Sequence, residues 1–280
     1  MYLVTGATGN VGSNIVDQLL INGKKVRVFT RDPGKVAHWG ARIEVVIGDF
    51  EKQDTFVTAF AGVEAAFLMN RGTDGGSFQQ LIAAAKAQGH PGIVFLSTIL
   101  AGSPEFTVGK LHKDKEDAIR ESGLPGKFIR PGAFMTNSYQ WIGTIKSEGV
   151  VYNPTGMGKS ALIAPSDIAA VAVKALTDPD LPGEVFELTG SESLSAPEQV
   201  SILADALGKP IRCVDVPMET AVQGLIRTGI PPQMAAAVAQ SLEAIRDGRS
   251  ATIKDTVERV TGNKPKTFKT WAHEHASRFA

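Results

Sequence analysis

The first half of the chain alternates short apolar runs with segments in which apolar residues recur at helical spacing. Residues 2–5 have the length of a buried strand, and residues 14–22 follow with the periodicity of a helix that faces a core. Later strands are expected over 25–30, 43–47, 65–69, 92–97 and 126–130, and later helices over 55–60, 78–88 and 111–122. Strands and helices in strict succession require right-handed crossovers and a parallel sheet covered on both faces. The pattern therefore predicts an α/β fold with a doubly wound parallel sheet.

From Pro131 onwards this alternation breaks down. The stretch to Ala161 has scattered glycines and little periodicity, whereas a helix over 167–176 and a strand over 184–188 are again expected. The remainder predicts helices over 196–207, 219–227 and 233–247, and a strand over 211–216. We therefore expect a Rossmann domain of residues 1–133 plus about 162–189, and a smaller, discontinuous α+β C-terminal lobe of about 134–161 plus 190–280 that forms one wall of a cleft.

A glycine-rich segment joins the first strand to the first helix. Its glycines have the spacing G-x-x-G-x-x-G: Gly6 permits a tight turn, Gly9 lets a pyrophosphate approach the backbone, and Gly12 lets the helix pack on the sheet. The N-terminus of the helix adds free N–H groups and partial positive charge. A turn without ligand is the alternative, but the strand–turn–helix context favours dinucleotide binding. The residues predicted to hold the pyrophosphate are Gly6, Thr8, Gly9, Asn10, Val11 and Gly12.

The end of the second strand indicates which dinucleotide binds. An acidic residue at this place accepts from the 2′-hydroxyl of NAD, whereas an arginine accommodates the 2′-phosphate of NADP. Arg31 is the first charged residue after the strand, with Thr30 before it and Lys35 close behind. NADP(H) is therefore the preferred cofactor. NAD(H) stays open because Asp32 can take the hydroxyl, and Arg31 as a solvated turn residue is the other interpretation.

Further cofactor contacts are expected where later strands end, because ligands of such sheets bind at the carboxyl ends of the strands. Asp49 and Phe50 fit an adenine pocket, although Asp49 can equally cap the following turn. The remaining expected cofactor contacts are Met69, Asn70, Arg71 and Ser97.

Composition excludes several classes of function. Lysine plus arginine number 29 and aspartate plus glutamate 29, so the formal net charge is zero. Nucleic-acid binding and a polybasic membrane anchor both need excess positive charge, so neither is expected. A single cysteine excludes an internal disulfide framework, and no apolar run is long enough to span a bilayer. We expect a cytoplasmic protein, without metal or flavin, whose oligomeric state stays open.

Several segments together resemble one family. VTGATGNVGSNIVDQLL, VRVFTRDP, GDF, FLST, FIRPGAFMTN and DIAAVAVKAL are similar to the NmrA-like, atypical branch of the short-chain dehydrogenase superfamily. The C-terminal TVERVTGNKPKTFKTWAHEHA resembles the closing segment of quinone oxidoreductase and azoreductase-type members. The resemblance implies a Rossmann fold and a reductase that uses NAD(P)H.

The chain departs from the wider superfamily in its catalytic residues. Most relatives reduce carbonyls with a Tyr-x-x-x-Lys pair, in which the tyrosine donates a proton and the lysine lowers its pKa. Tyr2, Tyr139 and Tyr152 are each followed four residues later by a glycine, so no such pair exists. The resemblance places His112 at the position of the lysine, as in quinone-reductase-type members.

His112 is therefore the candidate catalytic residue, with Glu116 one helical turn away as its orienting partner. An imidazole there can bind the cofactor ribose or donate a proton, because its ordinary pKa is near 6.5. A solvated histidine in a charged segment is the alternative.

Two functions of different class follow. The first is an NADPH-dependent oxidoreductase that transfers a hydride to a flat, conjugated acceptor, such as a quinone or an azo compound, which needs no strong enzymic acid. The second is an NAD(P)-sensing regulator of the NmrA type, without turnover. The segment after the sixth strand favours the enzyme, since its apolar and aromatic side chains suit a small aromatic substrate, although packing between the lobes explains them equally well. The expected substrate-binding residues are Phe134, Met135, Tyr139 and Trp141.

Overall fold

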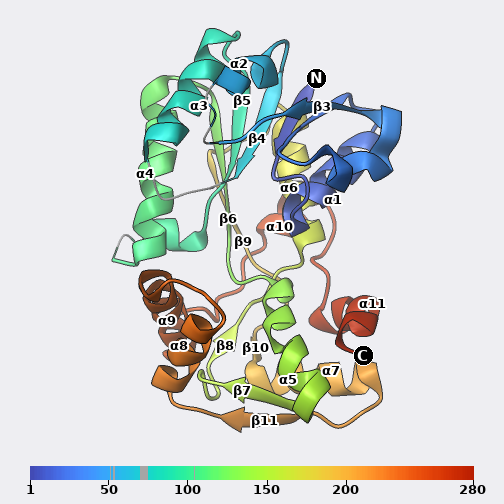
Figure 1. Ribbon diagram of the computed structural model, residues 1–280, viewed down its shortest axis with the longest axis vertical. Helices are drawn as coiled ribbons and strands as arrows, with labels where there is room; N and C mark the ends of the chain where they lie inside the picture. The colour runs from blue at the N-terminus through green and yellow to red at the C-terminus, as the bar shows by residue number, and fades with distance from the viewer. Residues whose placement is uncertain (51, 53, 70–74, 104) are drawn as a thin grey trace. The chain divides into compact units, whose positions relative to one another are not determined.

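The structure, a computed structural model, describes residues 1–50, 52, 54–69, 75–103 and 105–280 (Figure 1). The chain divides into two compact units. The first unit contains Met1–Pro131, Pro165–Leu188 and Arg259–Gly262, and the second contains Gly132–Ala164, Thr189–Glu258 and Asn263–Ala280.

A seven-stranded sheet forms the centre of the first unit, in the order β3-β2-β1-β4-β5-β6-β9. Every neighbouring pair in this sheet is parallel. The strands are β1 (Tyr2–Thr5), β2 (Val26–Thr30), β3 (Ile43–Ile47), β4 (Ala65–Met69), β5 (Gly92–Leu96), β6 (Gly126–Pro131) and β9 (Val185–Leu188). The order reverses at β1, where the chain passes from β3 across to β4. The doubly wound parallel sheet predicted from the sequence is thus confirmed.

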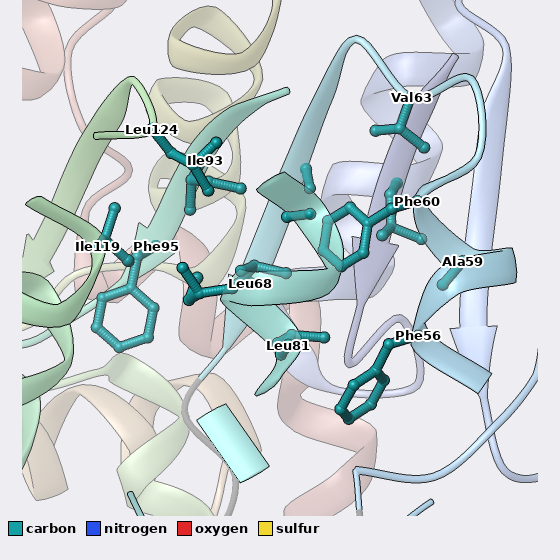
Figure 2. Packing of buried hydrophobic residues seen from close by; sticks show 14 of the residues in the cluster. Phe56, Ala59, Phe60, Val63, Leu68, Leu81, Ile93, Phe95, Ile119 and Leu124 are labelled. Carbon is teal, nitrogen blue, oxygen red and sulfur yellow. The ribbon is translucent and has the colours of Figure 1, made fainter. Parts of the chain in front are cut away.

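Helices cover both faces of this sheet. On one face, α1 (Asn10–Ile21) packs against α6 (Pro165–Thr177), and on the other lie α2 (Asp54–Phe60), α3 (Gly75–Ala87) and α4 (Thr107–Ser122) (Figure 1). Figure 2 shows the core beneath the second face, where Phe56 and Phe60 of α2 lie close to Leu81 of α3, and Phe95 of β5 to Ile119 of α4. Burying such side chains contributes about 1.5–3 kcal/mol each, which holds the strand ends in place.

Several helices begin earlier than the apolar periodicity predicts. α1 starts at Asn10 rather than Asn14, and α4 starts at Thr107 rather than Leu111. The first turns of these helices expose polar residues, so the periodicity of the apolar face carries no signal there. For α1 the difference matters, because its first turn follows the glycine loop directly.

The second unit mixes helices with two small sheets. β7 (Val150–Asn153) pairs in parallel with β11 (Arg212–Asp215), and β8 (Lys159–Ser160) pairs antiparallel with β10 (Leu194–Ser195). Its helical elements are η3 (Met135–Trp141), α5 (Ile142–Glu148), α7 (Ala196–Leu207), α8 (Met218–Arg227), α9 (Pro232–Arg246) and α11 (Phe268–Phe279). The short helix α10 (Thr256–Thr261) begins in the second unit and ends in the first, because the division falls between Glu258 and Arg259. The segment 131–161, in which the sequence shows little periodicity, therefore contains four short elements, namely η3, α5, β7 and β8.

The core of the second unit is built around its C-terminal helix. Phe268, Trp271 and Phe279 of α11 are buried with Leu203 of α7 and Met135 of η3. Since these side chains come from distant parts of the sequence, the unit depends on the last residues of the chain.

Candidate functional site

The glycine loop between β1 and α1 has a geometry that only glycine allows at two positions. Gly6 has a φ of +64°, in the left-handed region, and its carbonyl accepts from the N–H of Gly9 at 2.9 Å. A Cβ atom on Gly12 would lie 2.2 Å from the same carbonyl oxygen. A Cβ on Gly6 would lie 1.9 Å from Met69 Sδ, so Met69 packs directly on the turn. The first turn of α1 is thereby drawn against the end of β1.

The N-terminus of α1 offers backbone donors to an anion. Its N-cap is Gly9, which has no side chain to cap the helix, and its first turn contains no acidic residue. Thr8 and Asn10 are exposed beside it, whereas Val11 and Gly12 are buried. An uncapped helix N-terminus with exposed flanking residues fits the pyrophosphate of a dinucleotide.

Arg31 and Asp49, both predicted to bind the cofactor, lie close together beyond β2 and β3. Arg31 Nη1 is 3.9 Å from Asp49 Oδ2, and the Arg31 side chain is 61% exposed. Asp32 is used locally, since its Oδ1 accepts from the N–H of Gly34 at 2.9 Å at the start of η1 (Pro33–Arg42). Lys35 is exposed and Thr30 is half-buried. Asp32 is thus held as a cap, while the guanidinium of Arg31 faces solvent.

The other predicted nucleotide contacts have mixed surroundings. The ring of Phe50 packs edge-on against Phe29, with centroids 5.6 Å apart, so it belongs in part to the core. Asn70 and Arg71 lie outside the described residues.

A buried ion pair joins β5, α4 and β6. Glu116 has no exposed surface, and its carboxylate accepts from Arg130 Nε at 2.8 Å and Nη2 at 2.6 Å. Ser97 Oγ donates to the same carboxylate at 2.5 Å. The hydrogen bond to Glu116 raises the pKa of Arg130 above its ordinary value. The Ser97 hydroxyl, predicted to contact the cofactor, therefore donates to Glu116. The sequence analysis named Glu116 as a partner of His112 but missed its pairing with Arg130 and Ser97.

His112 lies one turn before Glu116 on α4 and is largely shielded from solvent. Its ring is 5.9 Å from that of Phe95. Burial, with the nearby charge of Lys115, lowers the pKa of His112 to about 4. The imidazole is therefore neutral at pH 7, which disfavours an imidazolium proton donor and leaves hydrogen bonding as its available role. The carboxylate of Glu116 is held by Arg130 and Ser97, and orientation of His112 by Glu116 stays a prediction.

In the aromatic segment after β6 (134–141), some side chains pack in the core of the second unit and others line a cavity. Met135 is 1% exposed in the core of the second unit. The Tyr139 ring lies 5.5 Å from that of Trp271, and the guanidinium of Arg278 lies 5.0 Å from the Tyr139 centroid. Met135 and Tyr139, which were expected to bind substrate, pack within the second unit against residues of α11.

A cavity of about 90 Å³ lies within the second unit. Its walls come from η3, the segment from β7 to β8, the beginning of α7 and the end of α9. Of the four expected substrate residues, only Trp141 lines it. Phe134 is half-buried and forms an isolated bridge with Ile163.

The described residues offer neither a cluster of metal-binding side chains nor a membrane-spanning helix. No group of three or more histidine, cysteine, aspartate or glutamate side chains in that part of the chain is placed to hold a metal ion. No helix there combines the length and apolar character needed to cross a bilayer.

Comparison with known proteins is consistent with this geometry. A family described as NAD(P)H-binding matches residues 6–179. The (4-alkanoyl-5-oxo-2,5-dihydrofuran-3-yl)methyl phosphate reductase of Streptomyces griseus is 36% identical, covering 100% of this chain and 99% of the relative. The NAD(P)H azoreductase of Xenophilus azovorans is 33% identical with the same coverage of both chains.

Among solved structures, the quinone oxidoreductase QOR2 of Escherichia coli complexed with NADPH superimposes with a TM-score of 0.86 at 23% identity, covering 98% of this chain and 99% of the other. That likeness supports the fold, while the family match and the two relatives support NAD(P)H-dependent reduction. The chain belongs to the NAD(P)H-binding family, and it is an NAD(P)H-dependent reductase.

Proposed function

We propose that the protein is an NADPH-dependent oxidoreductase that transfers a hydride to a flat, conjugated acceptor such as a quinone or an azo compound, without a Tyr-x-x-x-Lys pair. The main support is the geometry of the Gly6–Gly12 turn. A Cβ atom on Gly12 would lie 2.2 Å from Gly6 O, so this position requires glycine, and no side chain caps the N-terminus of α1. The acceptor class is inferred from relatives, which include an azoreductase and a quinone oxidoreductase.

The residues at the edge of the sheet fit the cofactor. In this proposal the backbone of Gly6–Gly12, with Thr8 and Asn10, holds the pyrophosphate, and Arg31 with Lys35 holds the 2′-phosphate. Asp49, Phe50 and Met69 border the rest of the nucleotide. The nicotinamide supplies a hydride when it is bound, and these side chains set its position.

The absence of a strong acid suits the proposed acceptors. His112 is neutral at pH 7, and no tyrosine in the sequence has a lysine four residues later. Reduction of a quinone or an azo bond gives an anion that the conjugated system stabilises, so water can supply the proton. Catalysis then depends on orienting the nicotinamide and the acceptor relative to each other, which alone lowers the activation barrier by several kcal/mol.

The second unit is proposed to bind the acceptor. It contains Trp141 and the cavity beside it, and its lining residues combine apolar and neutral polar groups. Such walls match ligand sites in general, which are mostly apolar with a few placed polar groups.

Turnover with defined acceptors tests the proposal. The purified chain is mixed with NADPH or NADH and with a simple quinone, an azo dye or no acceptor, while the absorbance of the reduced nicotinamide is followed. We expect oxidation that depends on the acceptor and is faster at low NADPH than at low NADH. The spectrum of the purified chain, without flavin absorption, checks that hydride transfer is direct.

The alternative function, a sensor of the NmrA type, predicts a different result. His112 lacks a titratable proton near pH 7, which suits a protein without acid–base chemistry as well as a reductase of quinones. Tight binding of oxidised and reduced cofactor with no turnover of any flat acceptor would favour the sensor. A chain that binds neither dinucleotide would contradict both.

A further inference from the structure

We propose that the cavity in the second unit is a binding site for a small, uncharged ring compound that carries one carbonyl or hydroxyl oxygen. The site lies within the second unit alone, and its occupation needs neither cofactor nor turnover. The proposal deepens the proposed function, which places the acceptor in this unit, and because binding is measured without turnover it can fail or succeed separately from that function.

The walls determine the charge of the ligand. None of the described residues that line the cavity is charged. A charged ligand would lose its hydration without gaining an opposite charge, which is costly in a partly apolar site. An uncharged ligand is therefore favoured.

One wall residue has an unmet hydrogen-bonding group. Ser138 of η3 is 2% exposed, and its Oγ finds no hydrogen-bond partner in the part of the chain that the structure describes. By contrast, Asn153 in the same wall donates to the Gly156 carbonyl at 2.9 Å and accepts from Thr155. A buried hydroxyl without a partner costs about 1–3 kcal/mol, so a ligand oxygen that reaches it gains affinity. The hydroxyl can donate to a carbonyl or accept from another hydroxyl.

The apolar part of the wall determines the shape. Trp141 at the end of η3 and Leu242 and Ile245 of α9 supply large apolar side chains to the lining. A volume of about 90 Å³ favours a single ring over a fused system, since engineered apolar cavities of roughly 150 Å³ hold benzene. A flat ring also gains contact with the indole face.

Phenol and toluene form a matched pair of probes, because they are similar in size and only phenol carries the oxygen. Each is titrated into the full ¹⁵N-labelled chain without cofactor, and the indole N–H resonances of Trp39, Trp141 and Trp271 are followed by NMR. We expect phenol to move the Trp141 resonance saturably while those of Trp39 and Trp271 stay in place. Toluene is expected to bind more weakly. Equal shifts of all three resonances, or a shift that never saturates, would overturn the proposal.

Ser138→Ala isolates the hydroxyl. The variant should weaken phenol binding about three- to tenfold, as expected for one hydrogen bond, and leave toluene binding unchanged. Its thermal stability should not fall, because the hydroxyl has no partner to lose. Ser193→Ala is the matched control, since Ser193 Oγ is also buried without a partner but does not line the cavity. The same Kd for phenol in Ser138→Ala and in the unsubstituted chain would refute the role of Ser138.

A second variant tests the cavity from another element. Leu242→Phe enlarges a wall side chain on α9, and phenol affinity should fall at least fivefold. If it does not, the ring does not occupy this space. When the chain turns over a quinone, competitive inhibition by phenol identifies the ligand as the acceptor's ring, and noncompetitive inhibition identifies a separate small molecule. Binding to Trp141 without any turnover would support the cavity site while the proposed function fails.

Discussion

Arg130 donates two hydrogen bonds to the fully buried carboxylate of Glu116, at 2.8 and 2.6 Å, and so ties β6 to α4 in the interior of the first unit. Ser97 adds a third hydrogen bond from the end of β5. Glu116 lies one helical turn from His112 on α4, so the ion pair fixes the part of α4 that carries the candidate catalytic residue.

Glu116→Gln should destabilise the first unit severely. The amide keeps the shape of the side chain but removes the charge that pairs with the buried guanidinium of Arg130, so that Glu187 alone among the named carboxylates opposes it. Breaking such a buried pair costs about 3–5 kcal/mol. Urea denaturation at pH 7 measures the loss. The control is Glu184→Gln, because Glu184 is a half-exposed ion partner of Arg120 and should contribute at most about 1 kcal/mol. Similar small losses in both variants would show that the buried pair contributes little.

Gly12→Ala should weaken dinucleotide binding at least tenfold. The added Cβ would lie 2.2 Å from Gly6 O, so the first turn of α1 must move away from the turn that carries the proposed pyrophosphate contacts. We expect at least a tenfold rise in the Kd for NADPH, measured by fluorescence of the reduced nicotinamide. Gly224→Ala is the matched control on α8, where a Cβ meets no atom within 4 Å, and helix propensity predicts a gain of up to about 1 kcal/mol. Unchanged affinity in Gly12→Ala would contradict the proposed position of the pyrophosphate.

Arg31→Ala should separate the two cofactors. A charge-assisted bond to the 2′-phosphate contributes about 1.5–3 kcal/mol, so the KM for NADPH should rise roughly ten- to hundredfold while that for NADH changes little. The NADH measurement on the same variant is the internal control, since it reports any general damage to the site. An equal loss with both cofactors would assign Arg31 to another role.

His112 should make the fold sensitive to mild acid. Burial lowers the pKa of His112 to about 4 in the folded chain, whereas the unfolded chain keeps a value near 6.5. As the pH falls below 6.5 the unfolded state gains a proton that the folded state does not, so stability is lost. Between pH 7 and pH 5 this loss is about 2 kcal/mol.

His112→Gln removes the titration and provides the comparison. Denaturation measured at several pH values between 7 and 5 should show the unsubstituted chain losing about 2 kcal/mol relative to the variant, because only the unsubstituted chain contains the titrating imidazole. Parallel curves would mean that His112 titrates alike in both states.

The fold could be predicted further than the site. Each strand of the parallel sheet is an apolar run with nearby turn residues, so periodicity alone placed β1 to β6 within about two residues. β7 was missed because Val150–Asn153 is short and pairs with β11, about sixty residues later. Such distant pairing leaves no local pattern.

At the site, residue type alone indicated the glycine turn and Arg31, since their chemistry depends on local sequence. Arg130 was missed because it stands inside an apolar run, and its partner Glu116 lies on another element. Met135 and Tyr139 pack with residues of the second unit, and their role as substrate contacts stays a prediction. The sequence could not indicate this packing, because an apolar side chain looks the same whether α11 covers it or a ligand does.

Because each unit is built from segments that are far apart in the sequence, neither unit can fold completely until late in synthesis. The sheet of the first unit lacks β9, and α1 lacks its neighbour α6, until residue 188 has left the ribosome. The second unit lacks Phe268, Trp271 and Phe279 until residue 279 has left the ribosome. A nascent chain halted after residue 164 therefore exposes the apolar face of α1 and an incomplete core of the second unit. Exposed apolar surfaces of this kind are what chaperones bind.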